Sequence, residues 1–148
     1  MLSENWEHQI NELVKKEHND YKIKWIYTKD DAIDVSNIIN HLSLLNTSLL
    51  INKNNKNKMH QLVVKFIKKT PLELLIINLT KDEYPYGKVE IVKNGYVKGN
   101  MFNSPNIIVF SDKYPDIQKY SLARWEIYEI KNNILVENSL TEIWINKK

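Results

Sequence analysis

The hydrophobic positions near the N-terminus change their period along the chain. Lys22–Tyr27 is rich in β-forming residues and alternates in part, which favours a strand. On either side, apolar residues recur at spacings of three and four, which is typical of amphipathic helices. The first helical set, behind a capping Ser3, is Trp6, Ile10, Leu13 and Val14, and the second is Val35, Ile38, Ile39, Leu42 and Leu45. The pattern therefore predicts a helix, a strand and a second helix.

The middle of the chain continues this alternation. Thr47–Ile51 fits a short strand, and the polar run after it, residues 52–58, fits a loop. Lys58–Lys69 has a helical period, with four inward positions at Leu62, Val63, Phe66 and Ile67. Leu72–Leu79 is almost wholly apolar, which indicates a strand that is buried on both faces in a parallel sheet. Asn106–Ser111 has the same character.

The C-terminal part adds shorter elements and a hairpin. Lys88–Val92 fits a strand or a short helix, and Lys93–Tyr96 fits a turn. The tail, Arg124–Lys148, alternates with a period of two around an Asn-Asn turn, as an antiparallel hairpin does. Strands that alternate with helices and end in antiparallel strands predict an α/β three-layer sandwich with a mainly parallel central sheet. No repeat divides the chain, so residues 1–148 are expected to form one domain.

Composition excludes several kinds of site and location. The chain has no cysteine, which removes disulfides, thiolate zinc sites and cysteine nucleophiles. Its apolar runs stay well short of the ~20 residues that a membrane helix needs, and its N-terminus lacks the apolar region of a signal peptide. The sequence therefore predicts an intracellular protein, cytoplasmic or nuclear, with no membrane partner.

The kind of basic residue says more than the modest net charge of +3. Arg124 is the only arginine among 21 basic residues, and asparagine and isoleucine are unusually frequent. This bias is typical of an AT-rich genome, in which lysine is the default cation. A lysine therefore carries little meaning by itself, whereas Arg124 is a better indicator of function.

Glycine is scarce, and its positions argue against conventional nucleotide binding. The three glycines are Gly87, Gly95 and Gly99, so no strand-to-helix connection in the first half contains one. Phosphate loops and dinucleotide fingerprints need glycine because the backbone N–H groups must approach the ligand closely. A side chain at a positive-φ position there costs roughly 1 kcal/mol or more and also blocks the phosphate.

The second half of the chain resembles a known family. Ser104–Ile130, "SPNIIVFSDKYPDIQKYSLARWEIYEI", is similar to the end of the superfamily 3 helicase domain in replication-initiator (Rep) proteins of circular single-stranded DNA viruses. Earlier segments follow the order of that family. "ELVKKEH", "KWIYTKDDAIDVSN", "PLELLIINL" and "EIVKNGYVKGNMF" stand where it has a helix, the phosphate loop, the acid-bearing strand and a Lys-Asn-Gly stretch. The resemblance covers about residues 6–130 and implies a P-loop NTPase-like fold, an ATP-dependent helicase ancestry and an oligomer.

The loop at the family's phosphate site differs from what its chemistry requires. Asp31 and Asp34 stand in place of glycines and Val35 in place of the lysine, whereas Ser36 matches. Carboxylates at a helix N-terminus would repel a triphosphate. They can instead cap the helix, with Asp31 at the N-cap and Asp34 at N3. A hard cation is the less favoured alternative, because a calcium loop needs alternating ligands and usually a glycine.

Two further nucleotide-site positions also differ, and one charge is kept. Asn78 stands in place of the acid that handles Mg²⁺, and Asp112 in place of the family's asparagine sensor. Arg124 matches the arginine that reaches a neighbour's nucleotide, so an inter-subunit contact is expected for it. The resemblance thus implies a degenerate nucleotide site, with no catalytic residue, cofactor or metal ion.

Other residues have both an ordinary explanation and a functional one. The four histidines show no i, i+4 pair, so surface positions are favoured over a metal site. A cluster of cations near a helix end complements the helix dipole, but it can also contact nucleic acid. The lysines considered for such contacts are Lys65, Lys68, Lys69, Lys93 and Lys98. Tyr84-Pro85-Tyr86 is a candidate exposed loop for a partner or a base.

Three functions stay open at the level of sequence. The favoured one is a non-catalytic, helicase-like domain from a virus or an integrated viral element. It would act as a structural or interaction protein, as a homo-oligomer or with a related replication protein, and a viral origin adds the virion to the locations considered. The second is a module that binds single-stranded nucleic acid in viral or mobile-element DNA replication. The third is an active ATP-dependent helicase with unorthodox motifs.

Overall fold

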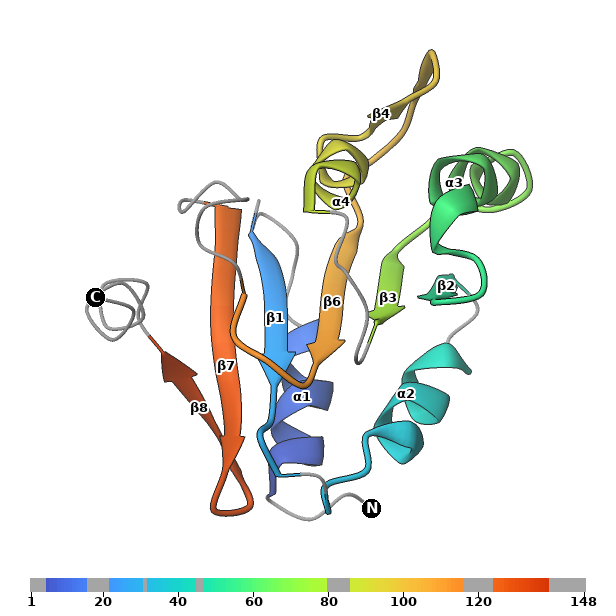
Figure 1. Cartoon of the computed structure of the whole chain (residues 1–148). Helices are drawn as coiled ribbons and strands as arrows, with labels where there is room; N and C mark the ends of the chain where they lie inside the picture. The colour runs from blue at the N-terminus through green and yellow to red at the C-terminus, as the bar shows by residue number, and fades with distance from the viewer. Residues whose placement is uncertain are drawn as a thin grey trace.

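The computed structural model describes residues 5–15, 22–30, 32–44, 47–79, 86–115 and 124–138 (Figure 1). The helices are α1 (Trp6–Lys15), α2 (Ser36–Ser43), the 3₁₀ helix η1 (Lys56–Lys58), α3 (Met59–Ile67) and α4 (Tyr86–Lys93). The strands are β1 (Ile23–Tyr27), β2 (Ser48–Asn52), β3 (Leu74–Asn78), β4 (Tyr96–Val97), β5 (Asn100–Met101), β6 (Asn106–Ser111), β7 (Trp125–Lys131) and β8 (Ile134–Asn138).

Helices form in two segments for which the sequence had allowed a strand or predicted a loop. The segment Lys88–Val92, which fitted a strand or a short helix, lies within α4. The polar run 52–58 is not wholly a loop, because η1 forms within it and leads directly into α3. Within the described residues, none of the helices combines the length and the apolar content needed to cross a lipid bilayer.

The central sheet has six strands in the order β2-β3-β6-β1-β7-β8. All neighbouring pairs from β2 to β7 are parallel, and β8 runs antiparallel to β7. β4 and β5 form a separate antiparallel hairpin, which extends beyond α4 at the top of Figure 1. The predicted fold class, an α/β sandwich with a mainly parallel sheet and a C-terminal antiparallel hairpin, is confirmed.

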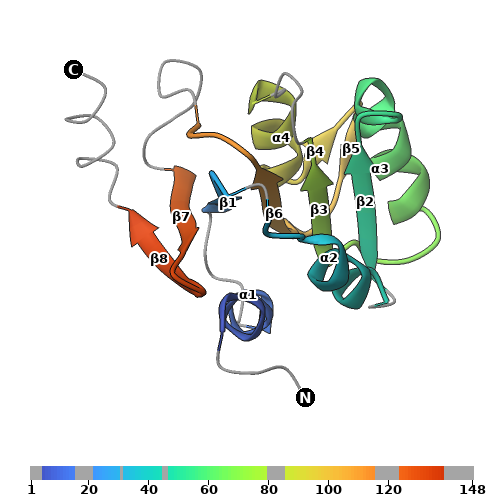
Figure 2. The same ribbon diagram turned by 60° about the horizontal axis from the view of Figure 1, so that its bottom comes forward.

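The helices cover the two faces of the sheet in pairs. Figure 2 shows α1 and α2 on one side and α3 and α4 on the other. Successive side chains of a strand point to opposite faces, so both layers pack on the same strands. In β3, Leu75 and Ile77 belong to the core with α3 and α4, whereas Leu74 and Ile76 belong to the core with α1 and α2. This double burial explains why the strand is apolar at consecutive positions.

Three aromatic rings join β1, β7 and α4 inside the sandwich. The rings of Trp25 and Tyr86 stack with centroids 5.6 Å apart, and the Trp125 ring meets them edge-on at 5.9 and 5.7 Å. The indole N–H of Trp25 donates to Lys113 O at 3.2 Å, and that of Trp125 to Glu90 Oε2 at 3.4 Å. The prediction that Tyr86 belongs to an exposed loop is wrong, since it begins α4 and is 7% exposed. The two residues before it lie outside the described part.

Three turns of the described residues contain the left-handed backbone conformation, and two of them explain the residue found there. Asn132 and Asn133 have φ values of 54° and 66°, as a type I′ turn requires, and they confirm the predicted hairpin of β7 and β8. Gly95, in the turn after α4, has a φ of +76°, and a Cβ there would lie 2.4 Å from Phe102 O. Both conformation and space therefore require glycine at this position.

The central-strand assignment predicts large effects of truncation. The side chains of Ile77 and Phe110 are 0% and 1% exposed, and the predicted deep burial of Leu75 and Ile108 is also confirmed. We expect Ile77→Ala or Phe110→Ala to lower the free energy of unfolding by about 2–5 kcal/mol, because each leaves a cavity. Urea denaturation measures this loss.

Ile134→Ala is the matched control for these truncations. The side chain of Ile134 is 47% exposed on the edge strand β8, so its removal should cost less than about 1 kcal/mol. A loss as small as that of the control at both core positions would contradict the burial described here.

Candidate functional site

A pocket of about 430 Å³ opens where β1, β3 and β6 end and α2 begins. Ligand sites of open parallel α/β sheets commonly lie at this edge, outside the carboxyl ends of the strands. The pocket is lined by Thr28, Asp30, Ile33, Asp34, Val35, Ser36, Asn78, Phe110, Ser111 and Asp112.

The pocket brings together residues that the sequence predicted for one degenerate site. Asp34, Val35 and Ser36 come from the loop before α2 and its first residue. Asn78 is the last residue of β3, and Asp112 directly follows β6. Asp31, the sixth predicted residue, lies outside the described part of the chain.

Several lining residues were not assigned to the site from the sequence. Thr28 and Asp30 follow β1, and Ser111 ends β6 with only 7% of its surface exposed. Their signal is positional, because polar residues directly after parallel strands converge at one sheet edge. Phe110 was predicted to be a core residue, and it also lines the pocket.

The loop between β1 and α2 binds its own backbone N–H groups. Asp30 Oδ1 accepts a hydrogen bond from Ala32 N at 2.9 Å, and Asp34 Oδ1 accepts one from Ser36 N at 2.9 Å. Thr28 Oγ1 accepts another from Asp30 N at 3.1 Å. In a phosphate loop, such N–H groups point at the ligand. Here side-chain oxygens of the same loop accept the hydrogen bonds that a phosphate would accept.

The predicted capping arrangement of α2 is wrong in its positions. The helix begins at Ser36, and its N-cap is Val35, which makes no side-chain capping bond. Asp34 therefore precedes the N-cap instead of standing at N3, and the N-cap is not Asp31. The local reason is that Asp34 forms a turn with the N–H two residues ahead, which keeps it out of the helix.

The pocket is acidic and has no cationic lining residue among those described. Hydrogen bonds from the side chain and the backbone N–H of Ser36 hold the pKa of Asp34 below its usual value. Asp30, Asp34 and Asp112 share the lining without a lysine, arginine or histidine. Such a site repels phosphate groups and attracts ammonium or guanidinium groups. No set of three or more His, Asp or Glu side chains in the described residues is arranged to hold a metal ion.

A second pocket of about 420 Å³ adjoins the first and shares Asp30 and Ile33 with it. It extends along the same edge to the β7–β8 turn. Near it, the Tyr27 hydroxyl donates to Glu129 Oε1 at 3.1 Å and accepts from Asn138 Nδ2 at 2.6 Å. Burial raises the pKa of Tyr27 well above its usual value, and its hydrogen bonding adds to the effect. This phenol therefore stays protonated and joins β1 to the terminal hairpin.

Arg124 lies at the amino-terminal ends of the strands, whereas the acidic pocket lies at their carboxyl ends. It directly precedes β7, whose first residue, Trp125, pairs with the first residue of β1, Ile23. Its Nη1 donates to Asn94 Oδ1 at 2.6 Å, and its Nε is buried with no partner among the described residues. Arg124 therefore does not line the pocket of its own chain, and its inter-subunit contact stays a prediction.

The lysines considered for nucleic-acid contact fall into two groups. Lys65, Lys68, Lys69 and Lys98 are exposed. Lys93 is 3% exposed, and its Nζ donates to Pro105 O at 2.7 Å, so its assignment as a surface contact is wrong. A buried ammonium must keep such a partner, because burial without one is costly.

Comparisons with known proteins identify no relative. No protein-family model, curated protein sequence or solved structure matches the chain significantly. The resemblance to Rep helicase domains therefore stays an expectation from the sequence.

The contact of Arg124 with Asn94 generates a test on stability. Arg124→Ala should lower the free energy of unfolding by about 0.5–1.5 kcal/mol, because it removes one hydrogen bond. Asn94→Ala should cost a similar amount, and the double variant little more than either single one, since both remove the same bond. Chemical denaturation of the four proteins measures the coupling. Fully additive costs would show that this contact does not stabilise the fold.

Proposed function

We propose that this chain is a non-catalytic, helicase-like domain that acts as an oligomeric structural or interaction protein. One observation carries the proposal. Where a nucleotide-binding α/β protein offers free N–H groups to phosphate, this loop carries Asp30 and Asp34, which bind those groups themselves. Asp112, which directly follows β6, adds a third carboxylate to the same pocket.

Charge and hydrogen bonding both disfavour a nucleotide at this pocket. A triphosphate would bring negative charge to within a few ångströms of three carboxylates, and each such contact is repulsive by about 1–4 kcal/mol at effective dielectric constants of about 80 to 20. Val35 supplies no charge where the family has a lysine, and Asn78 is a poor anchor for Mg²⁺. Binding would also require the two aspartates to release their N–H partners. The same edge of the sheet is therefore better suited to a positively charged protein group.

The first test is nucleotide titration. We expect isothermal calorimetry with Mg·ATP to show no saturable binding at micromolar concentrations, and no phosphate release in a hydrolysis assay. Saturable micromolar binding would contradict the proposal and favour the active-helicase alternative.

Val35→Lys separates the missing lysine from the added carboxylates. This substitution alone should not create ATP binding, because Asp34 and Asp112 still face the pocket. Val35→Leu, which keeps the apolar character, is the matched control for any effect on folding. ATP binding by Val35→Lys alone would mean that the carboxylates do not exclude phosphate.

A second candidate function, contact with single-stranded nucleic acid, is favoured by the distribution of charge. Residues 47–72 and 86–104 contain nine lysines and one acidic residue, Glu90, whereas the other described residues contain nine acidic and seven basic ones. Genome bias toward lysine would not also make acids this scarce in α3, α4 and the β4–β5 hairpin. We call the lysines of these segments other than the buried Lys93 the basic layer; they are Lys53, Lys56, Lys58, Lys65, Lys68, Lys69, Lys88 and Lys98.

The basic layer predicts salt-dependent binding of single-stranded DNA. Each phosphate contact adds about 0.7 to the slope of log affinity against log salt concentration, so neutralising three contacting lysines should reduce the slope by about 2. Fluorescence anisotropy with Lys53→Gln/Lys58→Gln/Lys88→Gln measures this change. The control, Lys15→Gln/Lys113→Gln/Lys131→Gln, changes the net charge equally outside the layer. Equal slopes for both triple variants would contradict a specific role of the layer.

A further inference from the structure

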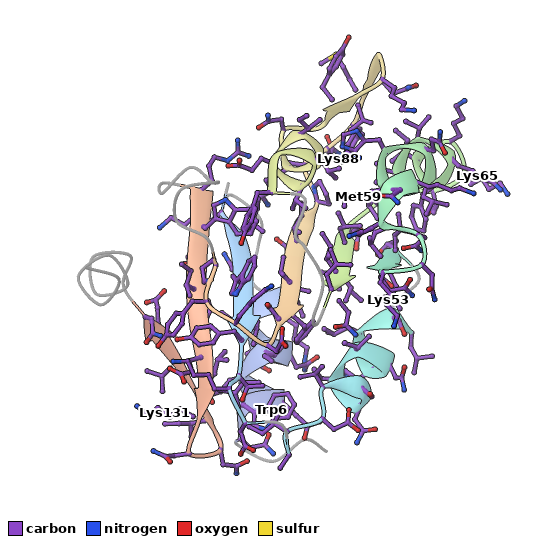
Figure 3. The ribbon with its side chains drawn as sticks, viewed as in Figure 1. Trp6, Lys53, Met59, Lys65, Lys88 and Lys131 are labelled. Carbon is purple, nitrogen blue, oxygen red and sulfur yellow. The ribbon has the colours of Figure 1, made fainter. Side chains whose placement is uncertain are left out.

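The acidic pocket and a group of three exposed lysines lie at opposite ends of the parallel strands. The acidic pocket lies where β1, β3 and β6 end, and its lining includes Asp30, Asp34 and Asp112. At the other end, three exposed lysines mark the C-terminal part of α3 and the residues after it, shortly before β3 begins; they are Lys65, Lys68 and Lys69. Figure 3 shows Lys65 projecting outward from α3, away from the sheet.

These two groups are separated within one chain. Lys69 precedes β3, whose last residue, Asn78, lines the pocket. The strand alone, from Leu74 to Asn78, spans roughly 13 Å at about 3.3 Å per residue. The lysines and the pocket aspartates therefore cannot form an ion pair inside one copy, but two copies that follow one another along the strand direction can bring them together.

The pocket suits lysine side chains in charge and in chemistry. Lysine carries a compact ammonium on a flexible four-carbon stem, which can extend into a pocket while its stem packs on apolar surface. Ile33, Val35 and Phe110 supply apolar lining beside the three carboxylates. The three lysines carry the charge opposite to that of the pocket's carboxylates, and the rest of the basic layer stays available.

Side-chain amides partly prevent a further strand from pairing with the two edge strands of the central sheet, β8 and β2. Gln9 Oε1 accepts from Leu135 N at 2.7 Å, and Gln9 Nε2 donates to Leu135 O at 3.5 Å on the edge strand β8. On β2, Asn55 Oδ1 accepts from Asn52 N at 2.8 Å, and Asn55 Nδ2 donates to Leu50 O at 3.3 Å. Because these amides take backbone groups that an added strand would use, strand-to-strand pairing between copies is disfavoured.

We propose that the lysine end of α3, formed by Lys65, Lys68 and Lys69, docks into the acidic pocket of a second copy of this chain. The inference rests on the proposed function, since it names the surfaces through which the domain would associate. The contact is head-to-tail, so each copy uses two different surfaces. Copies joined in this way form a ring if their rotation closes and an open chain if it does not.

The test uses one variant for each of the two surfaces. Lys65→Gln/Lys68→Gln/Lys69→Gln removes the lysine end, and Asp34→Asn/Asp112→Asn weakens the pocket without adding positive charge. Light scattering measures the mass before and after nuclease treatment, at about 20 mM and about 500 mM salt. Wild type should exceed the monomer mass of 17.6 kDa at low salt and approach it at high salt. Each variant should be a monomer at both.

Mixing the variants distinguishes this contact from any symmetric one. A 1:1 mixture contains one intact lysine end and one intact pocket on different chains, so it should form a heterodimer and nothing larger. Lys53→Gln/Lys58→Gln/Lys88→Gln is the matched control, with the same loss of charge elsewhere in the basic layer, and it should associate as wild type does.

The contradicting outcomes are distinct. An oligomer that both surface variants preserve would overturn this contact but leave the proposed oligomeric function standing. A wild-type monomer at low salt would overturn both the contact and the oligomer, while the ATP titration would still decide the non-catalytic part. An oligomer that disappears on nuclease treatment would assign the basic layer to nucleic acid and overturn the docking of a second copy.

Discussion

The structure depends on the burial of its central strands from both sides. β1, β3 and β6 carry apolar side chains at successive positions, and these divide between two cores that are covered by α1 and α2 or by α3 and α4. Burial of a single Leu or Ile contributes roughly 1.5–3 kcal/mol, so a strand that uses both faces contributes about twice as much as one that is half-exposed. This constraint holds the strands side by side between two layers of helices. It leaves the loops at their ends free to vary in sequence.

The acidic pocket is a consequence of that arrangement. Three parallel strands have their carboxyl ends side by side, so the polar residues at or just after these ends, Asp30, Asn78 and Asp112, meet whatever their chemistry. The loop after β1 then decides what the edge can bind. With glycines its N–H groups would be open to phosphate, whereas Asp30 and Asp34 close them with their own oxygens. Fold and ligand chemistry are therefore separable in this domain.

Double burial also decides how much could be predicted from the sequence. The long apolar run of β3 and the Asn132-Asn133 turn are strong local signals, and both elements form where expected. The order of strands had no local signal, because β1 finds its neighbours β6 and β7 only through tertiary packing. The site residues at strand ends were predictable by position. The start of α2 was not, since a single hydrogen bond of Asp34 outweighs helix propensity there.

Lysine was the residue type that the sequence described least well. Lys93 has the same sequence character as Lys98, yet its stem and ammonium are buried against Pro105 O while Lys98 is exposed at a hairpin turn. The total charge of +3 also hides a separation of charge that follows the layers of the fold. Both features arise only when distant segments come together, so neither composition nor periodicity reports them.

The loop's own carboxylates occupy the N–H groups that a phosphate would need. The decisive measurement follows the amide chemical shifts of Ala32 and Ser36 during titration with Mg·ATP, since these N–H groups donate to Asp30 and Asp34. We expect neither shift to change on addition of Mg·ATP. We also expect the Ser36 amide shift to respond to acid only below the usual pKa of an aspartate, as Asp34 becomes protonated. Saturable movement of both amides with Mg·ATP at neutral pH would show that these N–H groups are open to phosphate.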